Sequence, residues 1–254
     1  MDDMRRLQKT KANGLILSKD TSTPHQPLEE LFELVDIPEW KQNIIRKCCV
    51  YTVTSFNAIL DLIDSAEDIL TRDIPGDFVE CGVFMGGSSM IMAEVLKHFN
   101  STRTLWLFDT FDGVPMPNET ELTHSGENLK DWYVDNMIEM ETGKSDWCYT
   151  TLDVVKENIA ICDYDNMQFI VGRVEDTIPS IGPINIALLR IDVDLVDPTR
   201  HILEQFYPRL TTSGYLILDD YGHFPGIKKT VDDYFKHTPT EIIDVDKTVK
   251  RIIK

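Results

Sequence analysis

The sequence predicts an α/β protein with a doubly wound, mostly parallel sheet. Short apolar, β-rich segments alternate with segments whose apolar residues recur at helical spacing, which is the pattern of parallel strands joined by helices. The strand segments are nearly continuous apolar runs, as expected where helices cover both faces of a sheet; INIALLRID at 184–192 is the clearest case. The closing segment EIIDVDKTVKRIIK contains two β-rich pieces and predicts a C-terminal β-hairpin.

The elements follow in order along the chain. Strands are expected at 78–82, 104–109, 168–171, 184–192 and 215–219. Helices are expected at 88–99, 152–161, 198–210 and 227–235. The segment 110–150 contains prolines and glycines at intervals and is expected to be rich in loops.

Three regions are predicted along the chain. Residues 1–27 are polar and end in two prolines, so we expect a flexible N-terminal arm. Residues 28–73 carry apolar residues at helical spacing and predict a helical cap. Residues 74–254 form the main domain, and the total of 254 residues suits one large domain with an accessory segment.

Composition and charge exclude several classes of function. Apolar residues make up 42% and charged residues 27%, as in ordinary globular proteins. Lysine and arginine number 25 against 43 aspartates and glutamates, a net charge of −18 that disfavours nucleic acid and anionic membrane surfaces as partners.

No apolar run approaches the length of a membrane span, and the first residues lack an apolar leader, so we expect a cytoplasmic protein. The five cysteines show no CxxC spacing and are expected to be reduced thiols.

Acidic residues mark the ends of four predicted strands: Glu80, Asp109, Asp192 and the pair Asp219 and Asp220. In doubly wound sheets the ligand binds at the carboxyl ends of the strands, where the strand order reverses. Acids gathered at one sheet edge repel one another, so a cationic or hydrogen-bonding partner is expected among them.

A glycine-rich turn follows the first strand. Gly82 and the Gly86-Gly87-Ser88 segment lead from strand to helix, where the backbone can approach a ligand closely. The spacing is not that of the dinucleotide motif, and Glu80 on the strand suits a ligand ammonium group. Asp109, which ends the next strand, has the position from which an acid binds ribose hydroxyls. An adenosine ligand that bears a cationic amine satisfies both features.

The remaining acids predict a hard cation site. Asp192 and Asp194 point the same way while the chain stays extended, and Asp220 can join them if it lies past the end of its strand. Carboxylates from neighbouring strands favour magnesium, manganese or calcium over zinc. The alternative is that Asp219 and Asp220 serve only in turn formation and helix capping.

Five ordered blocks carry a resemblance to a known family: DFVECGVFMGGSSM, LFDTFDGVPMP, GRVEDTIP, LLRIDVD and LDDYGHFPG. Together they resemble the TylF-type macrocin O-methyltransferases, which use S-adenosylmethionine (SAM) and magnesium to methylate sugar hydroxyls. The resemblance spans roughly residues 51 to 254. It implies the Rossmann-like class I SAM methyltransferase fold, O-methylation of a sugar or glycosylated natural product, Mg²⁺ or Mn²⁺ as the metal, and a homo-oligomer.

The resemblance also assigns site residues. The cofactor-binding residues it implies are Val53, Thr54, Glu80, Gly82, Ser88, Asp109, Val174 and Glu175. In this assignment Glu80 and Gly82 hold the methionine end of SAM and Asp109 its ribose, while Val174 and Glu175 lie at the adenine edge. The implied metal ligands are Asp192, Asp219 and Asp220.

Two residues are candidates for the catalytic base. Asp194 matches the aspartate that serves as base in some relatives, although an ordinary aspartate is a weak proton acceptor unless burial raises its pKa. His223 follows Asp220 closely, and an imidazole suits proton transfer near neutral pH.

Three other functions remain open at the level of the sequence. A nicotinamide-dependent oxidoreductase explains the glycine turn and Asp109 but leaves Asp219 and Asp220 without a role. A non-catalytic protein could keep the methyltransferase fold without turnover. A catechol-type methyltransferase would share the metal chemistry and differ only in its acceptor.

Overall fold

A seven-stranded sheet forms the centre of the molecule. The structure, a computed structural model, describes residues 28–137 and 147–254; the predicted arm at 1–27 lies outside the described residues. The strands are β1 (Asp77–Cys81), β2 (Leu105–Asp109), β3 (Met167–Val171), β4 (Ile186–Ile191), β5 (Leu210–Leu218), β6 (Ile243–Asp244) and β7 (Lys250–Ile253). Their order is β3-β2-β1-β4-β5-β7-β6, with parallel pairing from β3 to β5 and antiparallel pairing of β7 with β5 and β6. This confirms the doubly wound sheet and the C-terminal hairpin.

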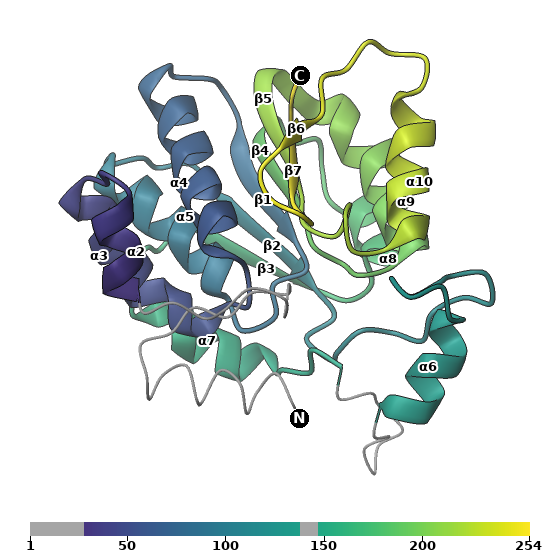
Figure 1. Cartoon of the computed structure of the whole chain (residues 1–254). Coiled ribbons are helices and arrows are strands. Elements are labelled where there is room, and N and C mark those ends of the chain that lie inside the picture. Colours follow the sequence, from purple (N-terminus) through teal and green to yellow (C-terminus); the bar gives the residue numbers. More distant parts are fainter. Residues whose placement is uncertain (1–27, 138–146) are drawn as a thin grey trace.

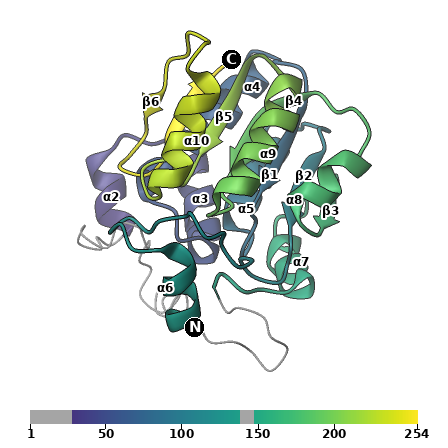
Figure 2. The ribbon, with the colours of Figure 1, turned by 90° about the vertical axis from the view of Figure 1, so that its right-hand side faces the viewer.

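Helices cover both faces of the sheet (Figures 1 and 2). One face is covered by α2 (Leu28–Leu34), α3 (Glu39–Cys48), α4 (Phe56–Thr71), α5 (Gly87–His98) and α7 (Leu152–Ala160). The other face is covered by α8 (Val174–Thr177), α9 (Val196–Phe206) and α10 (Pro225–Phe235). Short 3₁₀ helices are η1 (Cys49–Tyr51), η2 (Ile178–Ser180) and η3 (Tyr207–Arg209).

A further helix, α6 (Leu129–Asn136), lies in the region that the sequence predicts to be rich in loops. It stands apart from the two helix layers (Figure 1). Asn128 caps it by accepting a hydrogen bond from the backbone N–H of Asp131. Only Leu129 and Tyr133 are buried in this helix, so its apolar periodicity is weak.

The central strand β4 explains the layered arrangement. All six of its residues are buried, because helices cover it from both sides. The chain proceeds outward from β1 to β2 and β3, and then returns to place β4 on the other side of β1. The strand order therefore reverses between β1 and β4, which is where ligands bind in such sheets.

The helices that precede β1 share a core with the sheet. Ile59 and Ile63 of α4 are fully buried in the same apolar cluster as Phe78 of β1 and Met90 of α5. Helix α4 begins at Ser55, whose hydroxyl accepts a hydrogen bond from the N–H of Ala58. The predicted cap at 28–73 is thus helical and packed directly on the main domain, and the division of the chain at residue 73 stays a prediction.

A buried acid on α4 predicts a pH dependence of stability. Burial raises the pKa of Asp61 to about 6, while Arg251 opposes the rise and Asp64 and Asp246 add to it. The folded protein then holds this proton to a higher pH than the unfolded chain does, so ionisation of Asp61 lowers stability as the pH rises from about 4 to about 6.

We expect Asp61→Asn to remove this loss. Across that pH range its free energy of unfolding should rise relative to that of the native protein by about 1 to 2 kcal/mol, a value discounted for partial exposure. Urea denaturation at several pH values measures the difference. Asp135→Asn, on the exposed surface of α6, is the control. A difference that stays constant with pH would contradict the prediction.

Candidate active site

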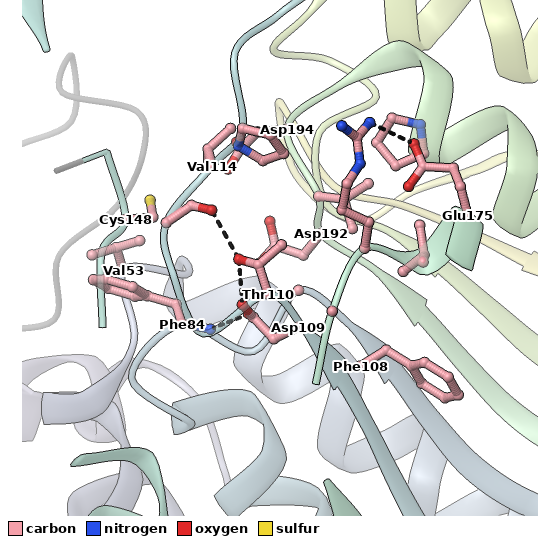
Figure 3. A pocket seen from close by; sticks show the side chains of 18 residues that line it. Val53, Phe84, Phe108, Asp109, Thr110, Val114, Cys148, Glu175, Asp192 and Asp194 are labelled. Atoms are coloured by element: carbon pink, nitrogen blue, oxygen red, sulfur yellow. Dashed lines mark hydrogen bonds and ion pairs between the residues drawn. The ribbon is translucent and has the colours of Figure 1, made fainter. Parts of the chain in front are cut away.

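A cavity of about 760 Å³, including the part open to solvent, lies at the carboxyl ends of β1, β2 and β4 (Figure 3). It therefore occupies the point where the strand order reverses. The predicted site residues that line it are Val53, Gly82, Asp109, Val174, Glu175, Asp192 and Asp194. Those that do not are Thr54, Glu80, Ser88, Asp219, Asp220 and His223.

Asp109 organises the glycine-rich turn at one side of the cavity. Its Oδ2 accepts hydrogen bonds from the backbone N–H groups of Val83 (2.6 Å) and Phe84 (3.1 Å). Its Oδ1 accepts one from the N–H of Phe111 (2.7 Å). The carboxylate that ends β2 thus holds the loop that follows β1 in place, and it still faces the cavity (Figure 3).

Gly82 lets the ends of β1 and β4 meet. It has a φ of +87°, and a Cβ atom at this position would lie 1.7 Å from the carbonyl oxygen of Asp192. Hydrogen bonds on either side fix the contact: Gly82 N–H donates to Phe108 O, and Asp192 N–H donates to Cys81 O, both at 2.8 Å. The turn and the first acid after β4 therefore form one rigid unit.

Three carboxylates gather beside this contact. Asp192, Asp194 and Asp220 each offer an oxygen, and these atoms lie within 4.8 Å of one another. Asp194 has a φ of 60°, and its N–H donates a hydrogen bond to Asp220 Oδ2 at 3.1 Å. The left-handed turn at Asp194 thus brings the loop after β4 against the end of β5. Oxygen ligands in this arrangement suit a hard divalent cation.

Asp219 lies in a different environment from its neighbour. Its side chain is 2% exposed, and its Oδ1 pairs with Nη2 of Arg190. The structure therefore brings Asp194 together with Asp192 and Asp220, whereas it sets Asp219 beside a buried guanidinium. The assignment of Asp219 as a metal ligand stays a prediction.

Arg190 on β4 is a site residue that the sequence reasoning missed. Its Nη1 lies 2.9 Å from both Glu80 Oε1 and Asp192 Oδ2, and Nη2 lies 3.3 Å from Thr54 Oγ1. Burial alone would lower its pKa, but Asp192, Asp219 and Glu80 together raise it. The signal in the sequence is a lone arginine inside an apolar strand, next to strand-end acids that need a cation.

Glu80 is fully buried and does not reach the cavity lining. Burial raises its pKa to about 7, against the opposing effects of Arg190 and Ser89. Its Oε2 accepts a hydrogen bond from the Ser89 hydroxyl, and its Oε1 binds Arg190. Ser88 is likewise buried in the first turn of α5. Their roles as cofactor contacts stay predictions.

The far wall of the cavity comes from the loop after β3. Val174 and Glu175 begin α8, and Glu175 accepts a hydrogen bond from Arg173 at 3.2 Å. In Figure 3 Glu175 lies on the opposite side of the cavity from Val53. These residues, predicted to lie at the adenine edge, therefore share one cavity with Asp109 and with two of the three clustered aspartates.

The two candidate bases lie on different loops. Asp194 belongs to the carboxylate cluster and lines the cavity. The His223 ring centroid lies 5.4 Å from that of His124, and the backbone N–H of His223 donates to the backbone carbonyl oxygen of Asp220. The choice between them stays a prediction.

This fold and site define the class of protein. The chain has a doubly wound sheet of seven strands with a cavity at the strand ends, and its structure is similar to that of the O-methyltransferase NovP, with a TM-score of 0.69. The two sequences are 27% identical, and the match covers 80% of this chain and 82% of that one.

The family is shown by sequence. The Macrocin-O-methyltransferase (TylF) family model matches residues 46–251, and the chain belongs to that family. Demethyldecarbamoylnovobiocin O-methyltransferase of Streptomyces niveus is 30% identical over 189 residues, which cover 72% of this chain and 67% of that protein. Mycinamicin III 3″-O-methyltransferase of Micromonospora griseorubida is 28% identical over 204 residues, 78% of this chain and 76% of that protein.

These findings confirm the resemblance drawn from the five sequence blocks. The chain is an O-methyltransferase, and this overturns the alternative of a nicotinamide-dependent oxidoreductase. Among the described residues, no helix has both the length and the apolarity needed to cross a membrane.

The contact between Gly82 and Asp192 yields a test with a matched control. Gly126 has nearly the same φ, +86°, but a Cβ there would meet nothing within 4 Å. We expect Gly126→Ala to cost about 1 kcal/mol of stability from backbone strain. Gly82→Ala should cost at least about 2 kcal/mol more, because the methyl group must displace the Asp192 backbone.

Thermal and urea denaturation of the two variants measure these costs. Binding of S-adenosylhomocysteine (SAH), the demethylated product of SAM, should weaken at least tenfold in Gly82→Ala and stay unchanged in Gly126→Ala. Equal losses of stability in both variants would contradict the prediction that a Cβ at residue 82 must displace the Asp192 backbone.

Proposed function

We propose that this chain transfers a methyl group from SAM to a hydroxyl group of a sugar or glycosylated natural product, with the help of Mg²⁺ or Mn²⁺. One observation carries the proposal: Asp192 and Asp194, two members of the carboxylate cluster, line the same cavity as Asp109 and Glu175. A cation site and a nucleoside site would then lie side by side in a single cavity.

The known substrates of relatives support the acceptor class. The related proteins from Streptomyces niveus and Micromonospora griseorubida methylate demethyldecarbamoylnovobiocin and mycinamicin III, as their names state. The name of a third relative, from Streptomyces olivaceus, specifies a rhamnosyl group on its substrate, and we therefore infer a glycosylated small molecule as the acceptor of this chain. Assembly into a homo-oligomer remains part of the same proposal.

The cofactor contacts follow from the cavity lining. Asp109 Oδ1 accepts a hydrogen bond from the N–H of Phe111, and a carboxylate oxygen can accept more than one, so ribose hydroxyls can also bind there. Gly82 would let the backbone approach the methionine end, and Val174 with Glu175 would contact the adenine.

The carboxylate cluster fits a hard cation by its donor set. Asp192 and Asp220 would hold the ion, with Asp219 as a further candidate, because carboxylate oxygens are the ligands that Mg²⁺ and Mn²⁺ prefer; Asp194, the third acid of the cluster, is kept as a candidate base. When bound, such an ion lowers the pKa of a hydroxyl group that it contacts. The residues of the chain would orient the acceptor oxygen toward the donor methyl group.

The proton of the acceptor hydroxyl needs a base in the chain. SAM supplies an activated methyl group, so the oxygen–methyl bond forms as the sulfur–methyl bond breaks and SAH is left. Asp194 or His223 would accept the released proton. Asp194 is favoured by its place in the cavity lining.

The direct test is methyl transfer. The protein is incubated with SAM, Mg²⁺ and a panel of glycosides, and mass spectrometry detects acceptors that gain one methyl group. We expect transfer to a sugar hydroxyl that stops when a chelator is added and returns with excess Mg²⁺. Transfer that is unaffected by the chelator would overturn the role of the cation, and transfer only to catechols would overturn the acceptor class.

Removing a cluster carboxylate should separate cation binding from cofactor binding. We expect Asp192→Asn and Asp220→Asn each to lower kcat at least a hundredfold, because the cation loses a charged ligand. The Kd for SAH should change less than threefold. Calorimetry and steady-state kinetics measure both, with Asp135→Asn as the surface control. Full turnover in either variant would remove that residue from the site.

Asp109→Ala should have the reverse effect. We expect SAH affinity to fall at least tenfold, because the ribose acceptor is lost and three backbone N–H groups lose their partner. Mn²⁺ affinity should stay within threefold of the native value. Titrations of the variant with SAH and with Mn²⁺ compare the two effects, and unchanged SAH affinity would dismiss the ribose assignment.

A further inference from the structure

We propose that Arg190 is a positioning residue that sets the Asp192 and Asp219 carboxylates for the divalent cation before the cation binds. The inference rests on the proposed function, because it concerns the same cation site. Arg190 itself does not line the cavity. It would act through the acids that it holds.

The geometry of the guanidinium is the first argument. Nη1 binds Glu80 and Asp192, and Nη2 binds Asp219 and Thr54, so the two nitrogens together hold groups from four segments of the chain. The side chain of Arg190 is only 3% exposed. A planar group with donors in fixed directions determines how each carboxylate is turned, which a single ammonium group cannot do.

The position of Asp192 is the second argument. Arg190 and Asp192 lie two residues apart at the end of β4, so their side chains can point to the same face. The backbone of Asp192 is fixed against Gly82, and its Oδ2 is fixed by Arg190 at 2.9 Å. Both ends of this residue are thus held, and a preset carboxylate loses little freedom when it binds an ion.

The charge balance is the third argument. The Arg190 guanidinium is surrounded by the carboxylates of Glu80, Asp192 and Asp219. Asp192 is a member of the acid cluster, and Asp219 is next in sequence to Asp220, another member. A buried arginine reduces the repulsion among these acids while leaving an excess of negative charge. That excess suits a dication, so the arrangement can be formed before the ion arrives and still attract it.

Thr54 extends the same network to the segment before α4. Its hydroxyl lies 3.3 Å from Arg190 Nη2, and its N–H donates to Thr52 Oγ1 at 3.1 Å. The neighbouring Val53 lines the cavity. Arg190 therefore also contacts the segment of the cavity wall that carries Val53.

The experiment compares Arg190→Lys with Arg72→Lys, a conservative change at an exposed ion pair with Asp68. Mn²⁺ binding is measured by calorimetry and by the electron paramagnetic resonance of the bound ion, and SAH binding is measured separately. We expect Arg190→Lys to weaken Mn²⁺ binding at least tenfold and to alter the spectrum of the bound ion. SAH affinity should stay within threefold, and excess Mg²⁺ should restore part of the lost kcat. Arg72→Lys should change none of these.

The results distinguish this inference from the proposed function. If the native protein binds no Mn²⁺, both are overturned. If the native protein and Arg190→Lys bind Mn²⁺ equally and with the same spectrum, the positioning role alone is overturned. Equal losses of Mn²⁺ and SAH affinity would mean a general structural role, and they would also overturn it.

A second pair of variants decides the question if Arg190→Lys does not fold. Thr54→Val removes one hydrogen-bond acceptor of the guanidinium at nearly constant volume, and Thr54→Ser keeps it. We expect about threefold weaker Mn²⁺ binding in Thr54→Val and native binding in Thr54→Ser. Unchanged Mn²⁺ affinity in Thr54→Val would overturn the positioning role.

Discussion

The missing side chain at Gly82 is the constraint on which the site depends. Strands β1 and β4 are neighbours in the sheet, but the chain leaves them toward opposite helix layers, so the loops after them must diverge from a shared edge. The carbonyl oxygen of Asp192 occupies the space that a Cβ of Gly82 would need. At this separation the loop held by Asp109 and the acids after β4 border one cavity.

The acids at this edge form two groups with different surroundings. Glu80 and Asp219 are almost wholly buried and face Arg190, whereas Asp192 and Asp194 line the cavity. Asp192 belongs to both groups, since it binds Arg190 and also lies in the carboxylate cluster. The ion pairs with Arg190 offset part of the cost of burying these acids, and the acids that line the cavity give it a negative charge that attracts cationic ligands.

The sequence was sufficient for the features that depend on local patterns. Apolar runs such as 184–192 identified the strands, and glycines and strand-end acids identified the edge where the cavity lies. The helix α6 was missed because only two of its residues are buried, although its capping residue Asn128 gave a local signal. The grouping of Asp192, Asp194 and Asp220 was predicted from the sequence, but on the assumption of an extended chain; the structure brings these acids together through a left-handed turn at Asp194, which the sequence did not predict.

Contacts between distant segments mark the limit of local reasoning. Arg190 meets Glu80 across 110 residues and Thr54 across 136 residues, and Ser55 donates to Asp246 across 191 residues. Asp246 lies in the turn of the C-terminal hairpin, and this turn also packs against Gly222, which follows the acid pair at the end of β5. There the Gly222 N–H donates a hydrogen bond to Thr248 O.

That turn therefore supports two sides of the site at once: the segment before α4, and the loop after β5. No periodicity or spacing rule encodes such a contact, because each partner alone satisfies the ordinary preferences of a helix cap or a turn. It follows that the last strands of the chain, which carry none of the proposed catalytic, cofactor or metal residues, still help to fix where those residues lie. The hairpin forms one edge of the sheet, and by binding Ser55 it helps to keep the neighbouring Thr54 within reach of Arg190.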